Sequence, residues 1–425
     1  MRLLLPLCFL GSLALVSAGS WGPESSQQYS GYFTVNTKQD NGGHIFYWMF
    51  ESRSKPETDP VILWMTGGPG CSSQLAVFYE NGPYVFNSTG DVDINPYSWN
   101  EVANVIYVDQ PVGTGFSYAD NHSDYVKNED QVGEDIDAPF FVTGESYAGH
   151  YVPAVANRIW KGNQNNEGIM INLAGAAIGN GFVNAELQYP EYVNFAKDNH
   201  LVKSEFALAI VEKETEMCKS MLHNKQQGAI LECDLIVTSV QKFGHNFNVY
   251  DIRKKCEGAL CYDFSPLDKL MGRKDFRDAL NVSEKAHWTE CNKLVYAELA
   301  NDWILKCDKY LVSLLDNGVP VLVYSGDQDF ICNYYGGRAW VNALKWSGAE
   351  GYKQQDEKDF MHKSQKSGTI RSYGPLTFLV VNEAGHMVPM DQPDVSLKMI
   401  DAFIHNQLPT SLISLSVGKE FVSVA

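Results

Sequence analysis

The chain has 425 residues, of which 44% are hydrophobic and 20% are charged, and its formal net charge is −18. This composition is typical of a globular protein that is long enough for one large α/β domain with an insertion. A negative charge of this size makes nucleic acids and anionic membrane surfaces poor partners.

The first eighteen residues have the pattern of a secretory signal peptide. Arg2 precedes an apolar run from Leu3 to Val16, and small residues lead up to Ala18. This run is too short to span a membrane, and no later segment is long and apolar enough to do so. We therefore expect a protein of the secretory pathway, either in the vacuole or lysosome or outside the cell. Three N-glycosylation sequons agree with this route and lie at Asn87, Asn121 and Asn281.

The chain contains nine cysteines, and Cys8 would leave with the signal peptide. No Cys-x-x-Cys pair or histidine cluster has the spacing of zinc ligands, so disulfides are the better interpretation in an oxidising compartment. The sequence does not give their connectivity. The eight remaining cysteines are Cys71, Cys218, Cys233, Cys256, Cys261, Cys291, Cys307 and Cys332.

Short apolar strands alternate with amphipathic helices along most of the chain. This alternation predicts an α/β fold with a mostly parallel central sheet and helices on both faces. In chain order, the predicted elements are a hairpin pattern within residues 31–65 that includes the buried strand Val61–Met65, strands at Asn104–Asp109 and Pro139–Thr143, a helix from Tyr147 to Ile159, a strand from Ile169 to Ile178, a helix at Cys307–Leu315, strands at Val319–Ser325 and Leu376–Asn382, and a helix at Val395–Asn406.

Residues 182–301 differ from the rest of the chain. They are polar, they lack the apolar runs of buried strands, and they favour long helices at Val202–Met221 and Ile230–Phe243. We interpret them as a helical cap inserted between two strands of the sheet. The core would then consist of residues 19–181 and 302–425, after a signal peptide at residues 1–18.

The predicted strand Pro139–Thr143 leads directly into Gly144-Glu145-Ser146-Tyr147-Ala148-Gly149. A sharp strand-to-helix turn with small neighbours lifts a serine hydroxyl above the sheet, where an adjacent base can activate it. Gly144 and Ala148 flank Ser146 at the two positions that need small residues, although the usual pattern has glycine at the second. The segment indicates a nucleophile elbow, and an ordinary turn with the same spacing is the alternative.

An elbow of this kind belongs to α/β-hydrolases, which place an acid and then a histidine at the ends of later strands. Asp327 and Asp329 both follow the predicted strand Val319–Ser325. The residues alone leave the choice between these two carboxylates open.

The histidine should follow a strand beyond the acid, and three histidines remain there. His362 lies in a polar segment, and His405 lies near the polar end of the terminal helix. His386 instead follows the strand Leu376–Asn382 in a loop that begins with glycine. We therefore predict that His386 is the general base.

Acyl transfer also needs two N–H donors for the oxyanion. One donor follows the nucleophile, at Tyr147, and the other comes from a glycine-rich loop after an early strand. The loop Thr66–Ser73, which contains Gly67-Gly68-Pro69-Gly70, supplies it. It is not a phosphate-binding loop, because no lysine follows the glycines.

Together these residues resemble the serine carboxypeptidase family, close to carboxypeptidase Y and its plant type III relatives. The resemblance covers almost the whole mature chain and implies an α/β-hydrolase fold. Its motifs are Trp64–Ser73, Gly144–Tyr151, Asn248–Arg253, Gly326–Asn333 and Gly385–Pro389.

The resemblance implies that Asp329 is the acid that orients His386 and that the N–H groups of Gly68 and Tyr147 form the oxyanion hole. It also implies that Glu80 and Glu145 help to recognise the C-terminal carboxylate of the substrate. At low pH a protonated carboxyl donates a hydrogen bond to that carboxylate instead of repelling it. From the residues alone, Glu145 could equally be a solvated carboxylate and Glu80 an ordinary charge at a helix end.

Thr66 stands where many members of the family have asparagine, and its hydroxyl can still donate to a carboxylate. The resemblance places two apolar pockets beside the triad, for which core packing of each aromatic residue is the alternative. Tyr147, Trp303, Ile331 and Cys332 would line the pocket before the scissile bond, and Tyr79, Tyr250, Tyr262 and Met387 the pocket for the leaving residue. The family pairing of cysteines would join Cys71 to Cys291, Cys218 to Cys233 and Cys256 to Cys261.

The crossover that precedes the nucleophile strand departs from the family pattern. Relatives carry a long amphipathic helix there, whereas residues 118–138 contain few large apolar side chains among many acidic ones. A crossover helix needs an apolar face that packs on the sheet. We therefore expect reduced stability for this chain, as in an incomplete gene model or a splice form.

The expected function is that of a serine carboxypeptidase that acts at acidic pH through an acyl-enzyme on peptides and proteins with a free C-terminus, preferring large apolar residues. The resemblance implies no metal or organic cofactor. The alternatives are a serine carboxypeptidase-like acyltransferase and a poorly folded or non-catalytic variant. The sequence does not give the oligomeric state.

Overall fold

The computed structural model describes residues 20–35, 42–120, 138–168, 170–226, 228–258 and 260–408. The predicted signal peptide, the sequon at Asn121 and residues 121–137 of the crossover lie outside these ranges. The expectations attached to them therefore remain predictions.

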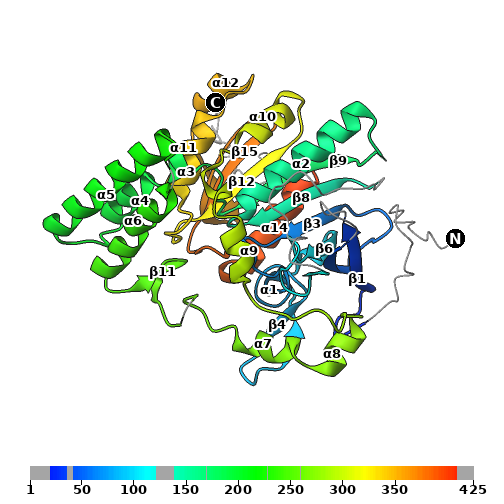
Figure 1. Cartoon of the computed structure of the whole chain (residues 1–425). Helices are drawn as coiled ribbons and strands as arrows, with labels where there is room; N and C mark the ends of the chain where they lie inside the picture. Colours follow the sequence, from blue (N-terminus) through cyan, green and yellow to red (C-terminus); the bar gives the residue numbers. More distant parts are fainter. Residues whose placement is uncertain are drawn as a thin grey trace, which may run out of the picture.

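The described residues form an 11-stranded central sheet, which confirms the predicted α/β fold (Figure 1). The strand order is β1-β2-β6-β3-β8-β9-β12-β15-β14-β13, and β7 pairs with β2. The neighbouring strands β6, β3, β8, β9, β12 and β15 pair in parallel. At the two edges, β1 and β2 on one side and β14 and β13 on the other pair antiparallel. The strands are β1 (Gln28–Val35), β2 (Gly43–Phe50), β3 (Val61–Met65), β6 (Asn104–Val108), β7 (Tyr118–Ala119), β8 (Phe140–Glu145), β9 (Leu173–Gly179), β12 (Val321–Gly326), β13 (Lys358–His362), β14 (Gln365–Tyr373) and β15 (Leu376–Val381).

The parallel strands are recognisable in the sequence because both of their faces are covered. Every residue of β3, β6, β8, β12 and β15 is buried, so these strands are continuous apolar runs rather than alternating ones. Successive side chains of β3 enter opposite cores: Leu63 packs into one and Trp64 into the other.

The antiparallel edge hairpin β13–β14 has no such signal, because its strands are partly exposed. His362, which the sequence places in a polar segment, is the last residue of β13. Its Nε2 atom lies 2.9 Å from a carboxylate oxygen of Asp394, on a helix at this edge of the sheet.

Helices cover both faces of the sheet, as predicted (Figure 1). The first face packs against α2 (Ala148–Asn165), α10 (Lys309–Asp316), α11 (Tyr334–Ala343) and α12 (Ala349–Lys353). The second face packs against α1 (Gln74–Tyr79), the 3-10 helix η1 (Trp99–Glu101), α7 (Ser265–Met271), α8 (Lys274–Ala279) and α14 (Pro393–Ile404). A small hairpin of β4 (Tyr84–Phe86) and β5 (Val92–Ile94) follows α1, and α13 (Val388–Asp391) precedes α14.

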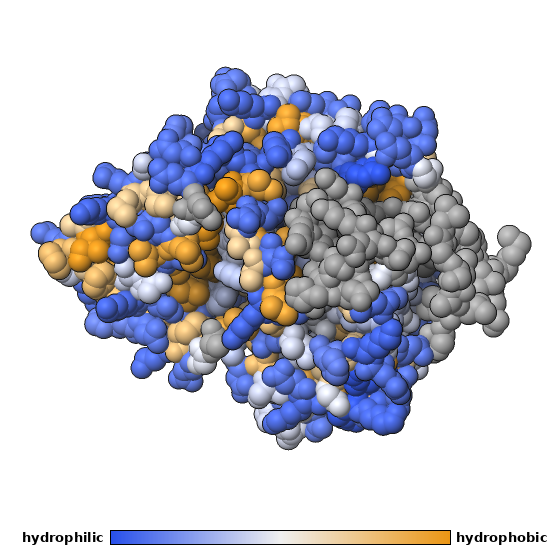
Figure 2. All heavy atoms as spheres, viewed as in Figure 1, coloured by the Kyte–Doolittle hydropathy of each residue, from blue (hydrophilic) through white to orange (hydrophobic). Residues whose placement is uncertain are grey.

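The chain between β9 and β12 contains the helices expected of a cap and one small sheet that was not expected. The sheet pairs β10 (Phe247–Asn248) with β11 (Asp251–Lys255). The further helices, besides α7, α8 and α10, are α3 (Ala185–Gln188), α4 (Glu191–Asp198), α5 (Glu205–His223), α6 (Ala229–Phe243), α9 (Lys293–Glu298) and the 3-10 helix η3 (Asp302–Ile304). Apolar side chains gather over α5 and α6 in Figure 2, and the exposed ones of these helices are Phe206, Met217, Leu231 and Leu235.

Several predicted boundaries need correction. The helix after Ser146 runs on to Asn165, and β9 begins at Leu173 rather than near Ile169. The side chain of Asn163 holds the backbone of Ile171 through two hydrogen bonds of 2.7 and 3.1 Å, so the chain enters the sheet only after this turn. Nothing in the part of the chain that the structure describes is a helix apolar and long enough to cross a bilayer.

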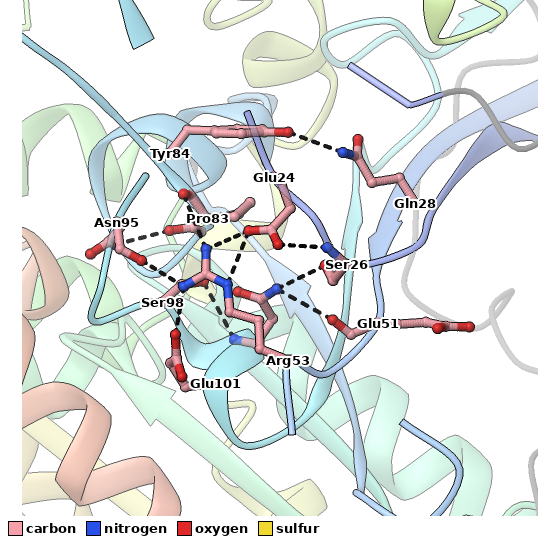
Figure 3. A network of polar contacts seen from close by, with 12 residues as sticks. Glu24, Ser26, Gln28, Glu51, Arg53, Pro83, Tyr84, Asn95, Ser98 and Glu101 are labelled. Atoms are coloured by element: carbon pink, nitrogen blue, oxygen red, sulfur yellow. Dashed lines mark hydrogen bonds and ion pairs between the residues drawn. The ribbon is translucent and has the colours of Figure 1, made fainter. Parts of the chain in front are cut away.

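The segment before β1 is fixed by the half-buried side chain of Arg53, which follows β2 (Figure 3). The guanidinium contacts the carboxylate of Glu24 with two of its nitrogen atoms, and it also donates to Glu101 at 2.7 Å and to the Asn95 carbonyl at 2.8 Å. Burial acts to raise the pKa of Glu24, but the hydrogen bonds and charge of Arg53 hold it below its ordinary value. This partly buried ion pair attaches the start of the described chain to the antiparallel edge of the sheet.

Candidate active site

Ser146 lies in the sharp turn between β8 and α2, with a φ of 66° that non-glycine residues rarely adopt. Gly144 makes this turn possible, because a Cβ atom there would lie 2.4 Å from the Met65 carbonyl oxygen and 2.7 Å from the Cβ of Ala148. Alanine is therefore tolerated at position 148, since the facing residue has no side chain. The local geometry is that of a nucleophile elbow.

Asp329 and His386 lie at the carboxyl ends of the neighbouring parallel strands β12 and β15. The Asp329 Oδ2 atom lies 2.8 Å from His386 Nδ1, and both side chains are buried. Asp327, the other candidate acid, contacts the side chain of Gln328 instead. Of the two candidate acids that the sequence left open, Asp329 is therefore the one that contacts His386.

The Asp329 carboxylate is held in place by three further donors. The Asn180 side chain donates to Oδ2 at 2.8 Å, and the backbone N–H groups of Ile331 and Cys332 donate at 3.0 and 3.2 Å. Asn180 follows β9, the strand beside β12. Sequence reasoning missed this residue, although its place after a buried strand in Gly179-Asn180-Gly181 is a detectable signal.

The glycine-rich loop after β3 lies directly against the elbow. A Cβ atom on Gly67 would be 2.3 Å from the backbone nitrogen of Tyr147 and 2.9 Å from the Cβ of Ser146. The next residue, Gly68, has a φ of 109°, which only glycine adopts readily. The loop and the Tyr147 N–H group therefore border the same space beside Ser146.

A buried aspartate that sequence reasoning missed, Asp109, holds this loop from behind. It follows β6, and it accepts hydrogen bonds from the Ser72 hydroxyl at 2.7 Å, the Ser73 N–H at 2.9 Å and the Phe116 N–H at 2.8 Å. Burial raises the pKa of Asp109 to about 6, and these hydrogen bonds oppose the rise. The signal for its role is its position at the end of a fully buried strand.

Two buried carboxyls lie near the triad. Glu80 directly follows α1, and Glu145 is the last residue of β8. Each side chain has one oxygen without a hydrogen-bond partner among the described residues. Burial raises the pKa of Glu80 to about 7, and burial together with the nearby Glu80 raises that of Glu145. Glu145 Oε1 is 4.0 Å from His386 Nε2, so the pair adjoins the predicted base.

Thr66 is buried at the end of β3, and its hydroxyl accepts a hydrogen bond from the indole N–H of Trp64 at 3.0 Å. Because that bond occupies a lone pair, the hydroxyl proton remains available to an acceptor in the site. Sequence reasoning did not single out Trp64 for this contact.

The expected pocket residues separate onto the two faces of the sheet. Tyr147 and Cys332 belong to the core of the first face, and Trp303 and Ile331 pack against it. Met387 belongs to the core of the second face, and Tyr79 and Tyr262 pack against that core. Tyr250 packs against the first core and lies between the two groups, with its ring 5.1 Å from the His386 ring and 6.1 Å from the Tyr262 ring.

Among the described residues, one cluster of potential metal ligands is present: Asp329, Cys332 and His386, whose ligand atoms lie within 4.8 Å of one another. It coincides with the acid and base of the candidate triad, and His386 Nδ1 is already bonded to Asp329. Burial, and then the charge of Asp329, raises the pKa of the Cys332 thiol well above its usual range. A neutral thiol is a poor metal ligand and nucleophile.

The structure contains the three disulfides that the family resemblance implies. They are Cys71–Cys291, Cys218–Cys233 and Cys256–Cys261, and the first ties the glycine-rich loop to the inserted chain. Cys307 is buried. Of the sequons within the described residues, Asn281 is exposed and Asn87 is half-buried in a turn, where its side-chain oxygen accepts from Thr89 and Asp91.

The family model of serine carboxypeptidases matches residues 19–406. A serine carboxypeptidase-like protein of Oryza sativa subsp. japonica is 41% identical over 410 residues, which cover 91% of this chain and 95% of that protein. Serine carboxypeptidase-like 49 of Arabidopsis thaliana is 40% identical and covers 93% of this chain and 80% of its own.

The crystal structure of Kex1, a prohormone-processing carboxypeptidase from Saccharomyces cerevisiae, has a similar fold with a TM-score of 0.77. The two sequences are 26% identical, and the match covers 90% of this chain and 92% of the Kex1 chain. The likeness therefore extends over most of both chains. The chain belongs to the serine carboxypeptidase family, whose members are serine-type hydrolases of the α/β-hydrolase fold.

Proposed function

We propose that this protein is a secretory-pathway serine carboxypeptidase, vacuolar or secreted, that removes C-terminal residues from peptides and proteins at acidic pH. The observation that carries the proposal is the pair of buried carboxyls, Glu80 and Glu145, beside the Asp329–His386 couple. An endopeptidase or esterase site has no need of two buried acids there, whereas an enzyme that binds a free carboxylate does.

The two carboxyls would act as hydrogen-bond donors. Because the pKa of Glu80 is raised to about 7 and that of Glu145 is also raised, both are protonated at mildly acidic pH. A neutral carboxyl donates to a carboxylate at little electrostatic cost, and an ionised one repels it. The Thr66 hydroxyl, which accepts from Trp64, would add a third donor.

The chemistry would follow the serine hydrolase pattern. His386 takes the proton of the Ser146 hydroxyl as the oxygen attacks the last peptide carbonyl, and Asp329 stabilises the resulting imidazolium. The N–H groups of Gly68 and Tyr147 hold the oxyanion. His386 then protonates the leaving amino acid, and water hydrolyses the acyl-enzyme by the reverse sequence of proton transfers.

The pockets support a preference for large apolar side chains. The residue before the scissile bond would contact Tyr147, Trp303, Ile331 and Cys332. The ring of Trp303 is 4.8 Å from that of Tyr147, so this side has an aromatic wall. The leaving residue would contact Tyr79, Tyr250, Tyr262 and Met387, on the other side of the carboxyl pair.

The test is hydrolysis of an N-blocked dipeptide with large apolar residues, compared with the same peptide amidated at its C-terminus. We expect turnover of the free acid at pH 5, much slower cleavage of the amide, and loss of turnover and of fluorophosphonate labelling in the Ser146→Ala variant. Equal cleavage of the two peptides would refute the exopeptidase proposal. Transfer of an acyl group from a glucose ester, without peptide hydrolysis, would instead identify an acyltransferase.

A further inference from the structure

Residues 248–254, which we call the clamp segment, connect the inserted chain to both catalytic loops. The segment contains the turn between β10 and β11, and its sequence Asn248-Val249-Tyr250-Asp251-Ile252-Arg253 is one of the family-like motifs. The mechanism proposed above uses only the ring of Tyr250. The remaining residues of the motif have no assigned role.

On one side, the clamp segment binds the loop that carries Asp329. The Val249 carbonyl accepts from the N–H groups of Phe330 and Ile331 at 3.1 and 3.0 Å. The Ile252 N–H donates to the Gln328 carbonyl at 3.0 Å. The backbone on both sides of Asp329 is therefore bound to this segment.

On the other side, the clamp segment binds the loop that carries His386. The His386 N–H donates to the Tyr250 carbonyl at 2.7 Å. Gly385 packs so closely that a Cβ atom there would be 2.4 Å from the same carbonyl oxygen and 2.9 Å from the Cβ of Asp251. The base thus takes its backbone position from the inserted chain as well as from β15.

An ionic cluster fixes this contact. The Asp251 carboxylate is fully buried and accepts two hydrogen bonds of 2.8 Å from Arg253, while Lys254 lies 2.9 Å from it. The same two cations reach the His386 loop: Arg253 donates to the Glu383 carbonyl at 3.0 Å, and Lys254 donates to Asp391 at 3.1 Å.

Asp391 links the ionic cluster to the backbone next to His386, because its other carboxylate oxygen accepts a hydrogen bond from the Gly385 N–H at 2.7 Å. Burial acts to raise the pKa of Asp251, but hydrogen bonds from Arg253 and Lys254 hold it below its ordinary value. The cluster is therefore charged at the working pH. Removing one partner would leave a buried carboxylate poorly compensated.

We propose that Arg253 is a positioning residue for the reaction: through Asp251 and the Glu383 carbonyl it holds the His386 loop against the Asp329 loop. A guanidinium that donates two hydrogen bonds to one carboxylate fixes both the distance between the two groups and their relative orientation. A lysine at this position would fix only the distance. The proposal rests on the proposed function, because it assigns Arg253 to the geometry of that triad.

The experiment compares the Arg253→Met and Arg253→Lys variants with the parent. We expect Arg253→Met to lower kcat per active site by about tenfold to a hundredfold while KM changes by less than about threefold, as for a displaced catalytic group. The rate of fluorophosphonate labelling should fall in parallel, and its final stoichiometry should not. Arg253→Lys should recover part of the loss.

Arg273→Met is the matched control. Arg273 also pairs with an aspartate two residues away, its Nε donating to Asp275 at 3.0 Å, but this pair is exposed on α8. The control should leave kcat and labelling unchanged. If Arg253→Met lowers only the yield or the melting temperature and keeps the parental kcat per titrated site, the proposal is wrong.

If Arg253→Met does not fold, the Lys254→Met and Arg253→Lys variants test the positioning role of Arg253 instead. Both are expected to lower kcat per site by a smaller factor, and parental values in both would overturn the proposal. A parent that labels with fluorophosphonate but does not cleave peptides would refute the proposed function alone. The labelling rates would still test Arg253.

Discussion

The Asp302 carboxylate anchors Tyr147, the residue that follows Ser146. Its Oδ2 atom accepts from the Tyr147 hydroxyl at 2.9 Å and lies 2.9 Å from Nδ1 of His150. The His150 ring stacks between those of Tyr147 and Phe182. All four side chains are buried, so the proposed oxyanion donor is held by a polar network under the elbow.

Replacing Asp302 with alanine should therefore damage both stability and catalysis. Two buried groups lose their acceptor, at a cost of about 1–3 kcal/mol each in the free energy of unfolding. We expect kcat/KM to fall by about tenfold or more as Tyr147 shifts. Denaturant unfolding and peptide hydrolysis measure the two effects. Asp302→Asn, which keeps an acceptor, should lose less, and parental kcat/KM in Asp302→Ala would contradict the role.

Gly67→Ala should displace the proposed oxyanion donors while it leaves the rest of the fold little changed. Its methyl group would lie 2.3 Å from the Tyr147 nitrogen, so the loop or the elbow must move. Displacing an oxyanion donor costs about a hundredfold to a thousandfold in kcat. Steady-state kinetics on the dipeptide measures this. Gly272→Ala, whose methyl group would have no neighbour closer than 3.6 Å, should behave like the parent. Similar kcat in both variants would exclude the loop from the oxyanion hole.

The carboxyl pair predicts a pH-dependent KM. As the pH rises through about 7, Glu80 loses its proton and begins to repel the substrate carboxylate. KM of the parent should therefore rise by about tenfold for each pH unit above that pKa. In Glu80→Gln the amide donates at every pH, so KM should change little between pH 5 and 8. An equally steep rise in this variant would show that Glu80 does not contact the carboxylate.

Stability should be greatest at mildly acidic pH. Burial raises the pKa of Asp109 from 3.8 to about 6, and of Glu80 and Glu290 from 4.5 to about 7. At pH values between the ordinary pKa and the raised pKa of each group, the folded state binds more protons than the unfolded chain. The free energy of unfolding therefore falls as the pH rises, and it levels off above about pH 7. Below about pH 4, protonation of Glu24 and Asp251, whose pKa values are lowered, removes stability instead.

The measurement is the melting temperature between pH 4 and 8. We expect a maximum near pH 4.5–5 and a decrease of about 4 °C or more by pH 7.5. Glu290→Gln removes one of the raised groups and should flatten the decline. A melting temperature that rises steadily to pH 8 would contradict the assignment.

The acidic crossover predicts a chain of reduced stability. Residues 121–137 lie outside the described structure, and their composition gives a helix little apolar surface for packing on the sheet. We expect low secretion yield and a broad or low-temperature melt. Good yield with a cooperative melt at an ordinary temperature would show that the short crossover is sufficient.

The fold was predictable where burial leaves a pattern. The strands that carry Ser146, Asp329 and His386 are continuous apolar runs because helices cover both faces, and each functional residue follows such a run. The edge hairpin β13–β14 was not predictable, since partly exposed strands lack that pattern. Asn180 and Asp302 also escaped prediction, because they act on residues far away in the sequence, Asn180 on Asp329 and Asp302 on Tyr147 and His150.

The proposed chemistry is predictable from the sequence, because the serine in its elbow, the glycine loop and the histidine after a late strand are local patterns that only certain residues satisfy. Tertiary structure decided between Asp327 and Asp329, because one turn of chain directs only the second carboxylate toward His386. It also decided the pKa values of the carboxyl pair, since folding buries Glu80 and Glu145 and brings the charge of Glu80 close to Glu145.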